Sequence, residues 1–298
     1  MTTSLASDAV QQALQEAAAR ATLAPSIHNS QPWRLIVRPG RLDFYADQTR
    51  RASVIDPTGR QLAISCGAAL FGVRVALAAA QIDAVTTLLP KPSEPDLLAA
   101  TSVIGMTASP DEDARRLDTA ALTRRSNRRR FTTDPVPDSL TDTLVHAAEV
   151  EGAWLHPIRE LDDRVMVAVL SQRAEALQNA DPDYRAELRS WTSGDPDRTD
   201  GVPAAAIPHT TGGAHDDIPI RDFDTDGAGA LPTETRSSLT QTMFVLGADG
   251  DDMRSWLIAG QALGRVLLVE NLALGGLVRP PVPRCDRRYR VATALVTA

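Results

Sequence analysis

A loop near the N-terminus, residues 24–33, carries the residue types best suited to bind a flat polar ring. It reads APSIHNSQPW. Two prolines restrict its backbone, and the Ser26 hydroxyl and Asn29 amide offer hydrogen-bond donors and acceptors. Fixed polar groups of this kind are what recognition of a planar heterocycle requires. The alternative interpretation is an ordinary turn whose Ser and Asn side chains satisfy their own backbone.

A second candidate is the stretch 124–130, which holds five arginines in seven residues. Arg124, Ser126 and Arg128 alternate, so two guanidiniums and a hydroxyl can converge on one phosphate, and arginine suits that bidentate geometry. A solvated charge cluster and a nucleic-acid patch are the alternatives. The net charge of −7 and the lack of interleaved aromatic residues argue against nucleic acid.

Hydrophobic periodicity predicts the elements that position these two stretches. The first follows a helix over 8–23, with Asp8 as N-cap, which ends because the residue before Pro25 leaves the α region. The second follows a helix over 111–122. Further helices are expected at 62–80, 139–149, 162–179, 184–191 and 251–274, and strands at 34–38, 42–46, 101–108, 242–246 and 289–296. Between 192 and 238 periodicity vanishes, which is typical of a lid or a disordered segment.

Two of the predicted helices share a sequence pattern. Residues 67–70 read GAAL and residues 260–263 read GQAL, and apolar residues follow both at matching positions. Such self-similarity indicates a weak internal repeat and so two related halves. Chance similarity between two helices rich in Ala and Leu is the alternative.

Residues 25–33 resemble the P-S-x-x-N-x-Q-P-W loop of the nitroreductase superfamily, and 24–33 as a whole is most similar to its Acg-like subfamily. In ordinary nitroreductases a flavin lies at a homodimer interface, between this loop and an R-x-S/T-x-R/K turn of the other subunit. The stretch 124–128 resembles that turn. The resemblance covers most of the chain and implies an α+β, nitroreductase-like fold. Two tandem halves, 1–110 and 111–298, would form an intrachain pseudo-dimer with one complete site and one empty pseudo-site.

The resemblance also implies the residues that contact the cofactor. The ring side of FMN would be bound by Pro25, Ser26, Ile27 and Asn29, its phosphate by Arg124 and Ser126, and its N1/O2 edge by Arg128. The segment 192–238 would be a lid over the flavin. No catalytic side chain is assigned, because the cofactor carries the chemistry. No metal site is expected, because the histidines show no ligand spacing.

Three functions remain open at this point. The first is an FMN-dependent oxidoreductase, which passes hydride from NAD(P)H to FMN and electrons on to a nitro or quinone-type acceptor. The second is a flavin-binding or flavin-sequestering protein with little turnover, because a long lid would cover the face where the nucleotide stacks. The third is a cofactor-free scaffold, because the tail after residue 275 fits the family pattern poorly.

Composition and apolar patterning indicate the cellular compartment and the kinds of partner to expect for this chain. No basic segment followed by an apolar one begins the chain, so no signal peptide is expected. The longest apolar stretch, 63–80, contains Arg74 and predicts a buried helix, with Cys66 packed in the core. Two distant cysteines fit a reducing compartment. We expect a cytoplasmic monomer with a small-molecule acceptor and without nucleic-acid or membrane partners.

Overall fold

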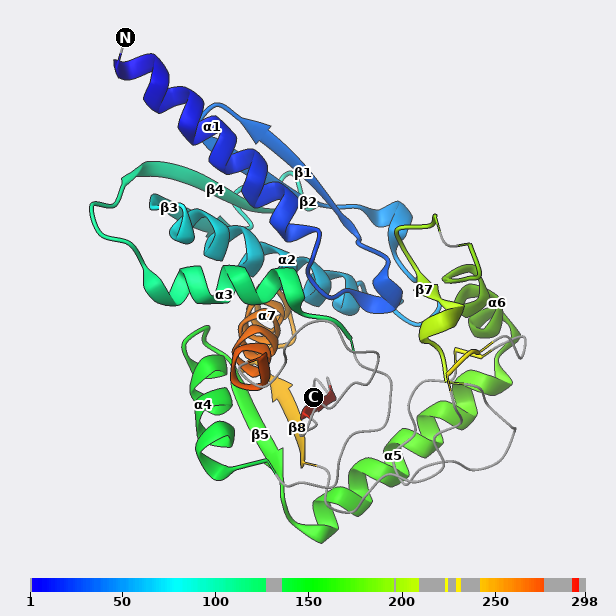
Figure 1. Cartoon of the computed structure of the whole chain (residues 1–298). Coiled ribbons are helices and arrows are strands. Elements are labelled where there is room, and N and C mark those ends of the chain that lie inside the picture. The colour runs from blue at the N-terminus through cyan, green and yellow to red at the C-terminus, as the bar shows by residue number, and fades with distance from the viewer. Residues whose placement is uncertain are drawn as a thin grey trace.

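The structure, a computed structural model, describes residues 2–126, 136–195, 197–208, 223–224, 229–231, 242–275 and 291–294. It mixes helices with antiparallel and parallel sheet, so the α+β prediction is confirmed. Figure 1 shows helices α2 (Arg60–Ala79) and α7 (Met253–Gly275) at the centre, with one sheet on either side of them.

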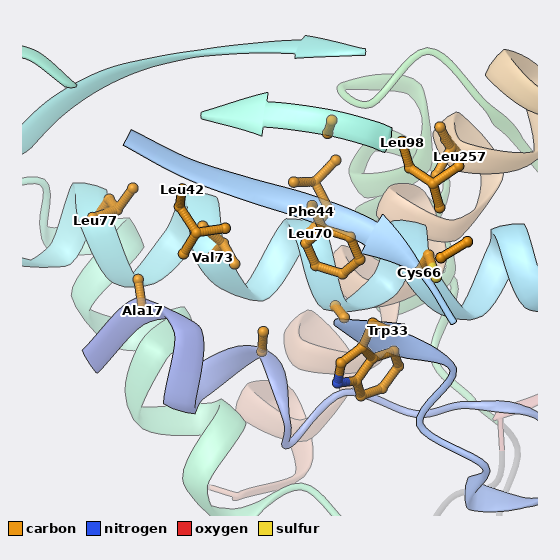
Figure 2. Close-up of a cluster of buried hydrophobic side chains, with 14 of the residues drawn as sticks. Ala17, Trp33, Leu42, Phe44, Cys66, Leu70, Val73, Leu77, Leu98 and Leu257 are labelled. Carbon is orange, nitrogen blue, oxygen red and sulfur yellow. The ribbon is translucent and has the colours of Figure 1, made fainter. Parts of the chain in front are cut away.

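The first sheet has the order β1-β2-β4-β3, and its neighbouring strands are antiparallel. Its strands are β1 (Trp33–Arg38), β2 (Arg41–Ala46), β3 (Ile82–Leu88) and β4 (Leu97–Met106). Helix α1 (Thr2–Ala21) and α2 pack against it, because Ala17, Leu42 and Val73 lie in one buried cluster with Phe44 and Leu70 (Figure 2). This core fixes the position of the loop that joins α1 to β1.

The second sheet has the order β5-β8-β9. Its strands are β5 (Trp154–Ile158), β8 (Thr242–Gly247) and β9 (Val291–Ala294), and its helices are α4 (Asp138–Glu149) and α7. A separate core forms here, in which Leu144, Leu155 and Phe244 are buried with Leu263. Helix α3 (Glu112–Thr123) bridges the two units, since Leu117 packs with side chains of both α2 and α7.

Helices α2 and α7 cross with their backbones in contact at two glycines. A Cβ atom on Gly67 would lie 2.4 Å from the Leu257 carbonyl oxygen, and one on Gly260 would lie 2.1 Å from the Ile64 carbonyl oxygen. The contact is reciprocal, because each glycine meets the carbonyl one turn before the other glycine. The crossing also links the two cores, because Ile64 of α2 packs in the second core and Leu257 of α7 packs in the first.

A third, smaller cluster lies beside the first sheet. It joins α6 (Pro182–Ser190) to the short strands β6 (Thr192–Ser193) and β7 (Val202–Pro203) and the turn Ala204–Ala206, through Tyr184, Leu188, Val202, Ile207 and Phe223. Helix α5 (Leu161–Ala180) leads to it from the second unit (Figure 1). The predicted lid, 192–238, therefore begins with ordered structure, and much of the rest of it lies outside the described residues.

Some predicted elements need correction. The first helix begins at Thr2 rather than at Asp8, so Asp8 is not its N-cap; no Gly or Pro in residues 2–7 interrupts the helix. Sequence periodicity missed β3 and β5, which are short strands. The predicted strand at 101–108 begins at Leu97, because residues 97–100 pair with β2 and β3. The predicted strand at 289–296 is present over Val291–Ala294.

Helix α2 is long and apolar enough, by composition alone, to cross a bilayer, and 78 % of its most apolar window is buried inside the protein. That burial is what a core helix of a folded domain shows. Cys66 on this helix is fully buried, as predicted, and its Sγ donates to the Pro32 carbonyl at 3.3 Å. Burial raises the pKa of the Cys66 thiol, so the unreactive thiol persists at neutral pH. Cys285 lies outside the described residues.

The glycine crossing gives a stability prediction. Gly67→Ala places a methyl group against backbone atoms that no rotamer change relieves, and should lower the free energy of unfolding by about 3 kcal/mol, the upper range for overpacking. Gly72→Ala, one helical turn further on, is the matched control. Its Cβ would meet nothing closer than 3.7 Å, so helix propensity should make it neutral or stabilising by up to about 1 kcal/mol. Urea unfolding followed by circular dichroism measures both, and equal values for the two variants would contradict the close crossing.

Candidate functional site

A narrow cleft lies where the end of α1, the loop after it, and helices α2, α3 and α7 meet. Its walls are formed by Arg20, Leu23, Ala24, Pro25, Ala68, Phe71, Gly72, Ala121, Arg124, Gly264 and Leu268. It encloses about 310 Å³, counting the space open to solvent at its mouth. The cleft brings together the loop and the arginine stretch that the sequence had singled out, and both central helices contribute to it.

Two guanidiniums are fixed at this cleft. Nη2 of Arg124 donates to the Leu23 carbonyl at 3.1 Å, which ties the arginine stretch to the end of α1. Arg20 makes a two-point ion pair with Asp118 on α3, with distances of 2.5 and 3.0 Å. Both partners of that pair are about three-quarters buried or more, so water screens it less than a surface pair. Both guanidiniums are therefore held in place, and the charge of Arg20 is compensated by Asp118.

The opposite side of the cleft is apolar and built from small residues. Ala68 and Gly72 of α2 and Gly264 of α7 line it, and the Phe71 side chain lies against Gly264. At Gly72 a Cβ would make ordinary contacts, at 3.7 Å, with the backbone of Arg20 and Ala21, so α1 packs closely on α2 beside the cleft. Apolar side chains beside fixed guanidiniums have the chemistry that a planar heterocycle with a phosphate requires. The enclosed space is only about 20 Å³, room for one water molecule, so FMN would require the cleft to widen.

The loop between α1 and β1 holds an uncommon backbone conformation. His28, Asn29 and Gln31 have φ angles of 49°, 55° and 50°, in the left-handed region that residues with side chains rarely adopt. Local hydrogen bonds maintain it: the backbone N–H of Gln31 donates to Oγ of Ser26 at 3.0 Å, and that of Ile27 donates to Oγ of Ser65 on α2 at 3.1 Å. The loop is thus pinned to the same helix that walls the cleft.

The segment 198–202 lies against this loop. Nδ2 of Asn29 donates to the Gly201 carbonyl at 3.0 Å, and the Gly201 N–H donates back to the Asn29 carbonyl at 3.1 Å. Nε2 of Gln31 donates to the Thr199 carbonyl at 2.9 Å. These bonds join the beginning of the predicted lid to the loop that the resemblance places beside a flavin.

An ion-pair cluster reinforces that contact. Asp200 pairs with Arg198 at 2.5 Å and with Arg50, whose Nε also donates to the Ser30 carbonyl at 2.6 Å. The hydrogen bond from Arg198 is the largest effect and, with the charge of Arg198 and a smaller contribution from Arg50, holds the pKa of Asp200 below its usual range, although burial opposes them. The carboxylate is therefore ionised at neutral pH, where it bridges the loop region and the 198–202 segment.

The predicted cofactor residues are only partly brought together. Pro25 and Arg124 line the cleft. The Ser26 hydroxyl is engaged within its own loop and the Asn29 amide with Gly201, as the ordinary-turn interpretation had allowed. The Ile27 N–H contacts α2, and Ser126 is exposed at the end of the described stretch. Arg128 lies outside the described residues. Contact of these residues with FMN stays a prediction.

Sequence reasoning missed several residues of the cleft. Arg20 was invisible as a site residue because an arginine near a helix end is common, and only the fold shows its pair with Asp118. Phe71, Gly72 and Gly264 were seen only as parts of apolar helices. The repeat was a usable signal for them, since it marked the two helices that form the wall.

Comparison with known proteins gives one consistent result. No family model matches the chain. A Mycobacterium tuberculosis protein named "Putative NAD(P)H nitroreductase acg" is 30% identical over 275 residues, which cover 91% of this chain and 79% of the relative. A second M. tuberculosis protein with the name NAD(P)H nitroreductase, also qualified as putative, is 34% identical over 252 residues, covering 83% and 70%. A third, uncharacterized, is 31% identical over 273 residues, covering 87% and 75%.

The contact between the loop and the 198–202 segment can be tested at Gly201. Its φ is +77°, and a Cβ there would lie 2.7 Å from the Trp191 carbonyl oxygen. Gly201→Ala should therefore displace the segment and speed amide hydrogen exchange at residues 199–202 and 29–31 by roughly tenfold or more. Gly194→Ala is the control, because its Cβ would point into open space. Unchanged exchange in the Gly201 variant would contradict the contact.

Proposed function

Because this chain belongs to the Acg-like group of the nitroreductase superfamily, we propose that it is an oxidoreductase that binds FMN and passes electrons from NAD(P)H to a nitro or quinone-type acceptor. One observation carries the proposal: the cleft joins the Pro25 loop to Arg124, beside a flat apolar wall. The names of the relatives support the reaction class. The cofactor and the acceptor are our inference from the chemistry of the cleft.

We infer that the chain is a pseudo-dimer of two nitroreductase-like halves. The reciprocal contact of Gly67 with Gly260 supports this, because a local twofold axis would generate it. The pairing of α1 with α2 in one unit is matched by that of α4 with α7 in the other. Both units also contribute to the cleft, as two subunits do at a dimer interface. A monomer is then sufficient for a complete site.

In this proposal each side of the cleft has its own task. Arg124, with Arg20 beside it, would hold the phosphate of FMN through charge-assisted hydrogen bonds. The loop from Pro25 to Asn29 would orient the ring against the wall formed by Ala68 and Gly72. Bound FMN supplies the hydride-accepting centre. The described residues offer binding, orientation and exclusion of water, and we assign none of them as a general acid or base.

Flavin sequestration is the second candidate, and one observation favours it. The hydrogen bonds from Asn29 and Gln31 hold the 198–202 segment directly on the ring-side loop. A segment held there restricts the approach of a nicotinamide to the flavin. The same segment can also open during turnover, as lids commonly do. The two candidates agree on FMN binding and differ in whether the bound flavin is reduced.

FMN binding is tested by the absorbance of the purified protein between 300 and 550 nm and by chromatography of the flavin released on heating. We expect about one FMN per chain. Arg124→Ala should weaken FMN binding by roughly 10- to 150-fold, the effect of losing about 1.5–3 kcal/mol from a charge-assisted bond. Arg125→Ala is the matched control, because the guanidinium of Arg125, the next residue along the chain, does not line the cleft. A protein that neither contains nor takes up FMN would contradict the proposal.

Turnover is tested by adding NADH or NADPH to the FMN-loaded protein without oxygen. An oxidoreductase should lose its flavin absorbance near 450 nm on mixing, and should recover it when a nitroaromatic or quinone is added. Gly201→Ala, which loosens the 198–202 segment, should bleach at least as fast as the wild type. Absence of bleaching at millimolar nucleotide in the wild type, together with bleaching in this variant, would favour sequestration and contradict the reductase proposal.

A further inference from the structure

The two central helices differ at positions that should match. If Gly67 and Gly260 are taken as equivalent, Gly72 of α2 corresponds to Arg265 of α7, and Ala68 corresponds to Gln261. Gly72 and Ala68 line the first cleft with small side chains. Their counterparts are two large polar residues. The pseudo-symmetric second position is therefore built differently from the first.

This second position can be located in the structure. When the α2 and α7 residues that line the first cleft are exchanged, three of the five resulting positions line another cavity. These are Phe71, Val75 and Arg265, whereas Gln261 and Gly264 lie outside its lining. That cavity lies between α2, α3 and the strands β3 and β4. It is larger than the first cleft, at about 1060 Å³ with the space open to solvent included. Two residues of its lining, Arg74 and Arg265, belong to a cluster of charged side chains that extends beyond the cavity.

The cluster is centred on Glu151. One carboxylate oxygen accepts from Nη1 of Arg74 at 2.5 Å, and the other accepts from Nε and Nη2 of Arg265 at 2.8 and 2.7 Å. Gln261 accepts a further bond from Nη1 of Arg74 at 2.8 Å. Both guanidiniums also lie over the ring of Phe71, at 4.9 Å for Arg265 and 6.0 Å for Arg74. Two cations and an aromatic ring thus surround one carboxylate.

Glu151 lies just after α4, in the position that Leu23 occupies just after α1. It follows the end of α4 by two residues, as Leu23 follows the end of α1, and α4 packs on α7 as α1 packs on α2. At the first cleft, Arg124 reaches the neutral carbonyl of Leu23. At the second position, Arg74 and Arg265 reach a carboxylate instead. The anion at the second position is therefore a side chain of the protein, the Glu151 carboxylate.

The Glu151 carboxylate is buried, so it stays between the two guanidiniums. The Glu151 side chain is 4% exposed, whereas Arg265 is 24% and Arg74 is 37% exposed. A buried carboxylate is stable only when it is paired, and here both of its oxygens are. If the carboxylate were removed, two guanidiniums would face a gap the size of a small anion.

From this geometry we propose that Glu151 is a built-in anion that closes the second cofactor position to phosphate-bearing ligands and so limits the chain to one flavin. The contacts of Glu151 with Arg74 and Arg265 are the evidence that its carboxylate fills this position. That the position would otherwise bind a second flavin rests on the proposed function. The asymmetry of the pseudo-dimer then lies in a specific ion-pair cluster.

The test removes the internal anion and offers an external one. With FMN-loaded protein at constant ionic strength, Glu151→Ala should be destabilised in a phosphate-free buffer. Its Tm should rise by about 5 °C or more as the concentration of inorganic phosphate reaches roughly 100 times the Kd for phosphate. The wild type should respond little. A variant that folds only when phosphate is present would support the proposal equally.

Two controls make the result specific. Glu149→Ala removes an exposed glutamate two residues away and should show no gain of phosphate response. Glu151→Ala combined with Arg74→Ala removes one of the two guanidiniums and should lose most of the phosphate response. The proposal is overturned if Glu151→Ala responds to phosphate no more than the wild type, or if it stays unfolded with phosphate present.

The FMN content of the same samples separates this inference from the proposed function. Glu151 does not line the first cleft, so the Glu151→Ala protein should keep one FMN per chain. FMN-free protein that still shows phosphate rescue would contradict the proposed cofactor and leave the internal anion supported. One FMN per chain without phosphate rescue would support the cofactor and overturn the internal anion.

Discussion

The contact between Gly67 and Gly260 is the constraint on which the rest of the structure depends. Two helices whose backbones touch have no side chains between them at the crossing, so the residues on either side must form walls. One wall carries Ala68 and Gly72 and borders the first cleft. The other carries Arg265 and Gln261. A bulkier residue at either glycine would separate the two sheets and change both walls together.

The cleft also depends on the strained loop after α1. Its left-handed residues are held by Ser65 on α2 and by the 198–202 segment, so the loop is fixed from two sides. A site built this way is preorganised, because the cost of the backbone conformation is met during folding rather than during binding. The same contacts make the segment and the loop move as one unit.

The sequence predicted the long elements and the two stretches that meet at the cleft, because helical periodicity and proline positions are local signals. It also marked the repeat whose glycines touch. It missed β3, and it missed β5, which pairs with β8 far along the chain. It missed Arg20, Asp118 and the glutamate at 151 for the same reason: their meaning lies in partners that only the fold supplies.

In the proposed pseudo-dimer, the difference between the two walls follows from joining two halves in one chain. In a homodimer, a residue that favours an open wall on one side of the axis appears on the other side as well. In a single chain, Gly72 and Arg265 are independent positions, so one side can stay open while the other is filled. An empty second site would leave guanidiniums and apolar surface without partners. The buried carboxylate of Glu151 pairs with the guanidiniums of Arg74 and Arg265, so in the proposed arrangement it fills this position and links α2 to α7.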